Sequence, residues 1–348
     1  MRNRSSALRK SLSKSLLKSL ALLGALTLTF SLIACSGSRD ESSTLVIYSG
    51  RTAEYIASVF EDFTATTGIE LDVRYGDSAA LAAQILEEGE NSPADLFISQ
   101  DAGALGAVSG AGLLANLPDT LLNEVGEYFR SSKSDWVALT GRVRILAYAP
   151  DRVSALPASV DDLVNPEWKG RLGIAPTNAS FQAFVTAMIE MRGEAATEKW
   201  LRGIVANSPK YFEKNSLIVE AIDSGEIDAG LVNHYYIYEV SEELGRKINV
   251  ENHYFKAGDV GNLVNASGVG IVRMSKKQEV AKQLVEYLLS KEVQERFVAE
   301  VHEYSVVDPS LKPDGLIALS EVQAPNVKLT DLADLQRTQR LLIKVGLL

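Results

Sequence analysis

Short apolar runs alternate with amphipathic stretches early in the chain, and this alternation constrains the fold more than any other feature. The runs at 44–49, 70–75 and 94–99 predict buried strands. The stretches at 53–67 and 79–88 predict amphipathic helices. Strand–helix–strand alternation of this kind is typical of a largely parallel sheet with helices on both faces. The sequence therefore predicts an α/β fold.

Polar residues follow two of these predicted strands. Arg51 and Thr52 come directly after the first strand, and Gln100 and Asp101 come directly after the third. The ligand site of a parallel sheet lies beyond the carboxyl ends of its strands. The sequence therefore places these four side chains at a predicted binding cleft. For Arg51 the alternative is an ordinary surface ion pair.

The pattern changes after about residue 136 and predicts a second α/β lobe. The strand predicted at 144–148 is placed to cross from one lobe to the other. Asn178 and Ser180 are both good N-cap types, so a helix is expected to begin near them. Two lobes without a flexible linker predict a pair joined by crossing strands, with a cleft between them. The remaining predicted elements are strands at 172–175, 227–232 and 268–272, a helix at 276–299 and an amphipathic tail at 329–345.

The first 34 residues have the pattern of a secretory signal. A basic region without acidic residues comes before an apolar run, and that run ends at Cys35, the only cysteine. The sequence Leu32-Ile33-Ala34-Cys35 resembles a bacterial lipobox, which implies cleavage before Cys35 and a lipid on its sulfur. The alternative is an ordinary signal peptide with a stray buried cysteine. The small, polar residues from 35 to 43 are predicted to form a tether between the lipid and the domain.

Charge and cysteine content narrow the class of protein. The chain has 35 basic and 45 acidic residues, and without the six basic residues of the predicted signal the balance is 29 to 45. A nucleic-acid binder needs a basic surface, so the acidity argues against that class. With no cysteine besides Cys35 the domain has no disulfide, and its stability must come from its core.

No catalytic motif stands out. The sequence lacks a Gly-x-x-x-x-Gly-Lys-Ser/Thr loop, a His-Glu-x-x-His pair and a Gly-x-Ser-x-Gly elbow. Its three histidines are far apart in sequence, and no pair of carboxylates stands out. The chain is therefore predicted not to be an enzyme, although a serine or carboxylate enzyme stays open on these grounds alone.

The most informative cluster is residues 233–238, with the sequence Asn-His-Tyr-Tyr-Ile-Tyr. Its tyrosines come directly after a predicted buried strand, where a cleft edge is expected. Packing is one explanation, because tyrosines are often core residues with a wet hydroxyl. Metal binding is the other, because phenolate oxygen suits small, highly charged cations, which can deprotonate tyrosine near neutral pH. Tyr235 and Tyr236 can share one metal only if the backbone turns there.

Several short segments, in this order and spacing, carry a family resemblance over about residues 45–347. They are Ile47–Arg51, Ser92–Phe97, Asp135–Arg144, Pro166–Arg171, Gly193–Ala196, Lys199–Leu201, Lys214–Ser216, Gly225–Ala229 and Val232–Tyr236. Together they resemble the ferric-ion-binding periplasmic proteins of bacterial ABC importers, which are class II solute-binding proteins.

The resemblance implies a two-lobed periplasmic-binding-protein-like fold of class II. Two mixed sheets flanked by helices would be joined by crossing hinge strands. The N-terminal lobe would comprise residues 44–142 plus about 267–318. The C-terminal lobe would comprise about 143–266 plus 319–348.

The resemblance also implies a ligand set. In the family, paired tyrosines bind Fe(III), which implies Tyr235 and Tyr236 as ligands here. Some members add a third tyrosine from the crossing strand, where this chain has Tyr148. Members with a histidine ligand carry it where this chain has Thr52, and members with a glutamate ligand carry it where this chain has Gln100. The set of one histidine, one glutamate and two tyrosines is therefore not available.

The fit is closer to members that combine tyrosines with a synergistic anion such as carbonate. Arg51 is the implied anchor, since its guanidinium can hold such an anion at two points. A phosphate site at a predicted helix start is also implied. Asp101 stands where phosphate-binding members have glutamine, and its charge would repel phosphate, so carbonate is the first expectation and phosphate the second. The residues implied for this second anion site are Asn178, Ala179, Ser180, Asn215 and Asn233.

The resemblance implies an extracytoplasmic lipoprotein that captures Fe(III) in the interlobe cleft and delivers it to the permease and ATPase of an ABC transporter. It would be a monomer held to a membrane by the lipid on Cys35, in the periplasm or on the outer face of the cell membrane. The main rival is a protein of the same fold for an organic anion, a phosphonate, a thiamine-like cation or a polyamine. A second rival is a lipoprotein enzyme or adhesin.

Overall fold

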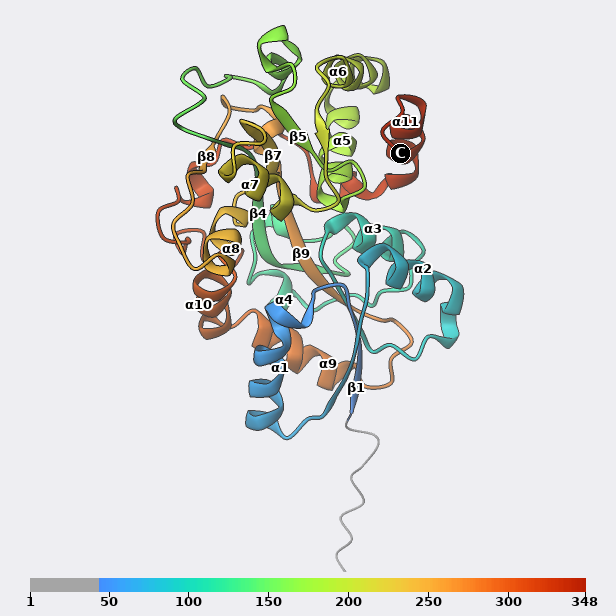
Figure 1. Ribbon diagram of the computed structural model, residues 1–348. Helices are drawn as coiled ribbons and strands as arrows, with labels where there is room; N and C mark the ends of the chain where they lie inside the picture. Colours follow the sequence, from blue (N-terminus) through green and yellow to red (C-terminus); the bar gives the residue numbers. More distant parts are fainter. Residues whose placement is uncertain (1–43) are drawn as a thin grey trace, which may run out of the picture. The chain divides into compact units, whose positions relative to one another are not determined.

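The computed structural model describes residues 44–348 as a framework of strands with helices packed on it (Figure 1). The predicted signal, the lipidation site at Cys35 and the tether lie outside these residues. None of the helices within 44–348 is long and apolar enough to cross a membrane. The strands are β1 (Leu45–Ser49), β2 (Leu71–Tyr75), β3 (Leu96–Ser99), β4 (Val137–Tyr148), β5 (Leu172–Ile174), β6 (Lys210–Tyr211), β7 (Ala229–Asn233), β8 (Glu251–His253), β9 (Val264–Ile271) and β10 (Tyr304–Ser305).

Two ladders of strands share the long strand β4. The order across the sheet is β2-β1-β3-β9-β4-β7-β5-β6. Up to Val143, β4 pairs with β9 and β10, and from Arg144 onward it pairs with β7 and β8. The change of partners between these two residues makes β4 the strand that crosses from one lobe to the other. We call the ladder of β2, β1, β3, β9 and β10 the first ladder, and the ladder of β7, β5, β6 and β8 the second ladder.

Both ladders mix parallel and antiparallel pairs. β1 is parallel to β2 and β3, and β5 is parallel to β6 and β7. β9 is antiparallel to both β3 and β4, and β7 is antiparallel to β4. The early strands alone predict a largely parallel sheet, and the insertion of the distant strand β9 beside β3 changes it to a mixed one. The two-lobed α/β fold with mixed sheets is thereby confirmed.

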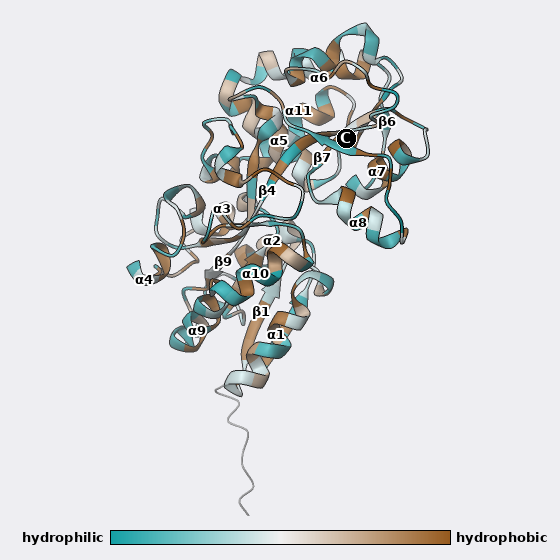
Figure 2. Cartoon of the chain, turned by 90° about the vertical axis from the view of Figure 1, so that its left-hand side faces the viewer, coloured by the Kyte–Doolittle hydropathy of each residue, from teal (hydrophilic) through white to brown (hydrophobic). Residues whose placement is uncertain are grey.

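Helices pack beside both ladders. In Figure 1, α1 and α9 lie beside the first ladder, and α5, α6 and α11 lie beside the second. Figure 2 shows apolar residues along β1 and β4 and many polar residues on the helices. The helices are α1 (Ala53–Thr67), α2 (Ser78–Glu88), α3 (Ala102–Gly110), α4 (Asp119–Leu122), α5 (Ala179–Arg192), α6 (Glu194–Ala206), α7 (Asn215–Asp223), α8 (Tyr236–Glu243), α9 (Gln278–Leu288), α10 (Lys291–Glu300) and α11 (Leu335–Lys344).

Local sequence signals set several of these boundaries. Helix α1 has the predicted bounds, and it ends at Gly68, whose φ of 74° is the left-handed conformation that glycine adopts without cost. Helix α5 begins after Asn178, whose side chain accepts a hydrogen bond from the backbone N–H of Ser180. The predicted N-cap is thus confirmed.

Several element boundaries differ from the prediction. Strand β4 contains the predicted residues 144–148 but begins at Val137, and β9 begins at Val264 rather than at residue 268. Both extensions contain buried polar residues, and Arg142 pairs with Asn265 across the ladder. The single helix predicted at 276–299 is two helices, because the Ser290 side chain accepts from the backbone N–H of Val293 and begins α10.

The core is built from apolar strand and helix residues. Ile47 and Phe97 of the first ladder and Phe181 and Phe184 of α5 are all fully buried. Each such side chain contributes roughly 1.5–3 kcal/mol relative to an exposed position. Because the domain has no disulfide, its stability is expected to come from its core, and this apolar burial provides it.

Candidate metal centre

The junction between β7 and α8 brings Tyr235 and Tyr236 together. β7 ends at Asn233, and Tyr235 already has helical angles, with φ −76° and ψ −19°. This turn places the two phenol rings on the same side of the chain, with their centroids 4.4 Å apart and an angle of 34° between their planes. Tyr235 is 4% exposed and Tyr236 is partly buried. The structure therefore has the backbone turn that a shared metal requires.

The side chain of His234 holds this turn in place through two hydrogen bonds. Its Nδ1 accepts a hydrogen bond from the backbone N–H of Val143 at 3.1 Å, and its Nε2 donates to the carbonyl of His302 at 2.8 Å. Burial lowers the pKa of His234 to about 4. The imidazole is therefore neutral, with its proton on Nε2, and it holds Tyr235 against the crossing strand.

The two phenols lie in an environment that favours their neutral form. Burial is the main cause that raises the pKa of Tyr235 and of Tyr236. The guanidinium of Arg142 acts in the opposite direction on both hydroxyls, and the side chain of Asn215 also favours the phenolate of Tyr236. A cation that displaces the phenolic protons would stabilise the two phenolates, which burial otherwise disfavours.

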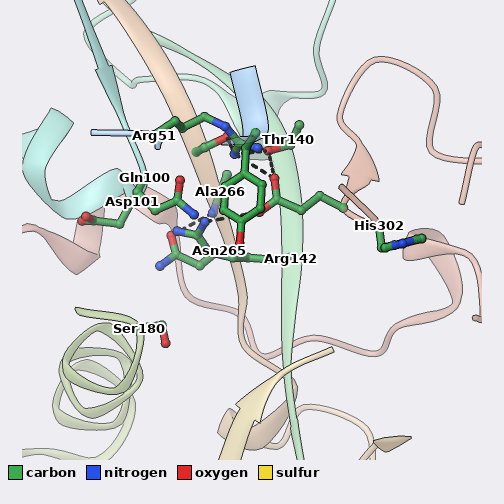
Figure 3. Close-up of polar contacts among 12 residues, drawn as sticks. Arg51, Gln100, Asp101, Thr140, Arg142, Ser180, Asn265, Ala266 and His302 are labelled. Carbon is green, nitrogen blue, oxygen red and sulfur yellow. Dashed lines mark hydrogen bonds and ion pairs between the residues drawn. The ribbon is translucent and has the colours of Figure 1, made fainter. Parts of the chain in front are cut away.

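Arg51 and Arg142 meet at the buried carboxylate of Glu303. Arg51 Nη1 lies 2.8 Å from Glu303 Oε2, and Arg142 Nη1 lies 3.6 Å from Glu303 Oε1. Although burial opposes it, the two arginines lower the pKa of Glu303. Arg51 Nη1 also donates to Thr140 Oγ1 at 3.1 Å and to Ser267 Oγ at 3.0 Å, and Figure 3 shows this cluster.

Both arginines keep N–H groups without a partner. Among the described residues, Nε and Nη2 of Arg51 and Nε and Nη1 of Arg142 are buried and donate no hydrogen bond, although Nη1 of Arg142 keeps its 3.6 Å ion-pair contact with Glu303. Arg142 acts electrostatically on both phenols and on Asp101, and Arg144 is also electrostatically coupled to both phenols. Arg51 thus forms a buried ion pair rather than a surface one. Of the two arginines that contact Glu303, Arg142 is the one whose charge acts on the tyrosine pair.

Three of the five residues predicted for a second anion site form one polar cluster at the start of α5. Asn178 Oδ1 accepts from the N–H of Ser180 at 3.0 Å and from its hydroxyl at 2.6 Å. Asn215 Nδ2 donates to both Asn178 Oδ1 and Ser180 Oγ, at 3.2 and 3.1 Å. Arg144 Nη1 donates to Ser180 Oγ at 3.0 Å. Asn233 lies opposite Arg144 in the ladder between β4 and β7, and Ala179 is the first residue of α5.

Tyr148 is not brought to the tyrosine pair. β7 runs antiparallel to β4, so Tyr148 lies opposite Ala229 at the start of β7, whereas the pair follows the end of β7. Four residues of strand separate Tyr148 from Arg144, a distance of roughly 13 Å. Its hydroxyl donates to Glu251 at 2.9 Å, and its ring meets His253 edge-on. The sequence hypothesis that Tyr148 is a third ligand therefore does not fit the register of the strands.

Two of the predicted cleft residues of the first ladder, Gln100 and Asp101, line a different cavity from Tyr235. Thr52 is exposed and precedes α1 without a capping side-chain bond. Gln100 and Asp101 line a cavity of about 620 Å³ that also contains Asn178 and Ala179. Burial raises the pKa of Asp101, against the backbone N–H of Ala104 and the charge of Arg142. This cavity joins the strand ends of the first ladder to the start of α5.

A second cavity, of about 640 Å³, lies beside Tyr235 and contains residues that the sequence did not indicate. Tyr55 of α1 and Glu239 of α8 face it, and Tyr55 Oη donates to Glu239 Oε2 at 2.9 Å. Glu239 lies three residues after Tyr236 and therefore on the same face of α8. This spacing is the only feature of the sequence that could have indicated Glu239 as a residue near the tyrosine pair. Acidic residues surround this cavity, and they are Glu54, Glu220, Glu239, Glu242, Glu243 and Glu300.

The donor set limits the kind of metal site. Within residues 44–348, no three His, Cys, Asp or Glu side chains gather in a way that could hold a metal ion. The phenol oxygens of Tyr235 and Tyr236 are hard donors of the kind that suit a trivalent cation.

Two lobes of α/β structure around a polar cleft define the class of extracytoplasmic solute-binding proteins. Residues 91–318 match a family described as bacterial extracellular solute-binding protein. The chain is 35% identical to the major ferric iron-binding protein of Neisseria meningitidis over 308 residues, which are 87% of this chain and 93% of that one. It is 33% identical to the Fe(3+)-binding periplasmic protein of Serratia marcescens, with 87% and 90% covered.

Solved structures agree with these relatives. The crystal structure of iron-bound HitA from Pseudomonas aeruginosa has a TM-score of 0.82 and 34% identity, with 87% of this chain and 99% of that chain covered. Apo ferric ion-binding protein A from Pasteurella haemolytica has a TM-score of 0.79 and 27% identity, with 88% and 98% covered. The chain belongs to the bacterial extracellular solute-binding proteins and is related to their ferric iron-binding members. These relatives are binding proteins, so the prediction that the chain is not an enzyme is confirmed.

Proposed function

We propose that this protein captures Fe(III) as its cargo with the phenolates of Tyr235 and Tyr236. The observation that carries the proposal is the turn at the β7–α8 junction, which holds the two rings 4.4 Å apart beside a cavity. Phenolate is a hard oxygen ligand and suits a small trivalent ion. The relatives support the same cargo, because their names specify ferric iron.

A carbonate anion, held by Arg142 and Arg51, completes the site. Both arginines have buried N–H groups without partners among the described residues, and a guanidinium edge suits a planar oxyanion. Phosphate at the start of α5 is the second choice. The side chains of Asn178, Ser180 and Asn215 already bind one another there, which leaves fewer free donors for a phosphate.

The captured iron is delivered to the permease and ATPase of an ABC transporter. Closure of the two lobes around iron and anion gives the form that docks, and binding shifts this equilibrium by its difference in affinity for the open and closed forms. The protein works as a monomer, anchored at the membrane by a lipid on Cys35.

One observation favours a second candidate, an organic solute in the same cleft. The cavity at Gln100 and Asp101 has a volume of about 620 Å³, and Ala79, Ala83 and Leu86 give it an apolar wall. An Fe(III)–carbonate pair does not require such a wall, whereas an organic cation or amphipathic molecule would use it.

Metal analysis and equilibrium dialysis test the proposal. We expect the purified protein to retain stoichiometric Fe(III) against a weak chelator in bicarbonate buffer. Failure to retain iron would contradict the proposal. Calorimetric binding of an organic cation by the same iron-free preparation would favour the second candidate.

A further inference from the structure

His302 makes three contacts with the segment that carries the tyrosine pair. Its carbonyl accepts from His234 Nε2 at 2.8 Å, and its own Nε2 donates to Glu242 Oε1 at 2.8 Å. Its ring stacks on Tyr238 with a centroid distance of 4.8 Å and an angle of 25°. Glu242 and Tyr238 are residues of α8, the helix that begins with Tyr236. One residue therefore touches both ends of this segment.

The backbone of His302 is in an unusual conformation. Its φ is +55°, in the left-handed region that non-glycine residues seldom occupy. Such conformations persist only where the surroundings enforce them, and they cluster at functional sites. Here the conformation lets the carbonyl face His234 while the ring faces α8.

A second contact reaches α8 from another element. Tyr55 of α1 donates its hydroxyl to Glu239 at 2.9 Å, and the guanidinium of Arg51 lies 5.7 Å from the Tyr55 ring. Tyr55 follows β1, and His302 lies between α10 and β10, so both belong with the first ladder. Helix α8 follows β7 of the second ladder. These contacts therefore join the two lobes directly at the tyrosine pair.

The residue after His302 extends the connection. Glu303 carries the ion pairs to Arg51 and Arg142. The dipeptide 302–303 thus contacts the tyrosine-bearing segment with one residue and both arginines with the next. Since Glu242 is 66% exposed, its pairing with His302 is weak by itself. The stack on Tyr238 and the hydrogen bond from Tyr55 give the connection its strength.

We infer that His302 and Tyr55 form a clasp that holds α8, and with it the tyrosine pair, against the first lobe and so slows the release of bound cargo. Neither residue acts as a metal ligand; both hold the tyrosine pair indirectly, through their contacts with Tyr238, Glu239 and Glu242. The effect on iron release rests on the proposed function, but the effect of the clasp on α8 itself does not.

Two substitutions in the full-length protein test the clasp. His302→Gly removes the ring contacts and keeps the left-handed backbone, which glycine adopts freely. Its matched control is Ser208→Gly, since Ser208 also has a positive φ, of 51°, outside the clasp. Tyr55→Phe removes one hydroxyl. Its control is Tyr128→Phe, which removes a hydroxyl that donates to the Val264 carbonyl of β9, in the first ladder.

Hydrogen exchange of the α8 amides in iron-free protein is the first measurement. We expect exchange roughly threefold to tenfold faster in each clasp variant than in its control, the effect of losing about one net hydrogen bond or stack. Equal exchange in variant and control would overturn the inference, whether or not the protein binds iron.

Iron release to a chelator is the second measurement. Each clasp variant should release Fe(III) roughly threefold to tenfold faster than its control while the iron–phenolate absorption band keeps its position and intensity. A weakened or shifted band in Tyr55→Phe would make Tyr55 a ligand and overturn the clasp. If the parent protein binds no iron, the proposed function fails and the exchange measurement alone decides the clasp.

Discussion

The imidazole of His234 accepts a hydrogen bond from the backbone N–H of Val143, at the point where β4 passes from one ladder to the other. This bond attaches the residue directly before the tyrosine pair to the strand that joins the lobes. The turn that brings the two phenols together is therefore tied to β4 at Val143.

The buried state of His234 predicts a pH dependence of stability. Its pKa is about 4 in the folded protein and about 6.5 when unfolded, so between these values the unfolded chain binds a proton that the folded chain does not. Stability should fall as the pH decreases through this window. Between pH 7 and pH 5 the loss from this residue is about 2 kcal/mol.

Urea unfolding of the parent protein and of His234→Gln, both in chelator, measures this loss. Glutamine offers an acceptor and a donor but does not titrate, so the variant should lose about 2 kcal/mol less than the parent over the same pH interval. Parallel pH profiles for the two proteins would show that His234 is not buried in its neutral form.

Tyr148 provides a test of the strand register. Because Tyr148 lies opposite Ala229 and away from the pair, Tyr148→Phe should leave the iron–phenolate band unchanged. It should cost at most about 1 kcal/mol in unfolding free energy through the lost hydrogen bond to Glu251. A clear loss of absorbance would restore Tyr148 as a ligand.

Arg142 is expected to determine the dependence on carbonate. Arg142→Met removes a guanidinium that acts on both phenols and has buried N–H groups free for an anion, so bicarbonate should no longer slow iron release, and retention should weaken about tenfold. Arg171→Met is the matched control, because Arg171 pairs with Asp228 away from the cleft. An undiminished bicarbonate effect in Arg142→Met would assign the anion to another anchor.

The pairing of Glu303 predicts a large effect on stability. Glu303→Gln leaves the buried guanidinium groups of Arg51 and Arg142 without their shared carboxylate. Breaking a buried ion pair on one side costs about 3 kcal/mol or more. Denaturant unfolding should show this loss, and a change below 1 kcal/mol would mean that water or another group compensates the two charges.

The sequence predicted the parts of the site that are local in the chain. Consecutive tyrosines after a strand and an asparagine before a helix are signals contained in a few residues, and the structure has the turn and the N-cap they indicate. The change of pattern after about residue 136 predicted the second lobe, and the family resemblance added the mixed character of the two sheets.

The parts that were missed depend on distant contacts. Arg51 and Glu303 are separated by 252 positions, and no local pattern marks them as partners. Tyr55 has the spacing of a core residue in an amphipathic helix, and its contact with Glu239 follows only from the packing of the two lobes. Tyr148 was misplaced because its distance from the pair depends on the register of β4 against β7, which the sequence does not reveal.

The visible absorption of iron-loaded protein tests the central claim most directly. Phenolate bound to Fe(III) gives a charge-transfer band, so the parent protein should be coloured. Tyr235→Phe and Tyr236→Phe should each weaken the band, and the double variant should be colourless and release its iron. The control Tyr148→Phe should retain the full band. A colourless parent protein, or a double variant that keeps the colour, would contradict iron capture by the Tyr235–Tyr236 pair.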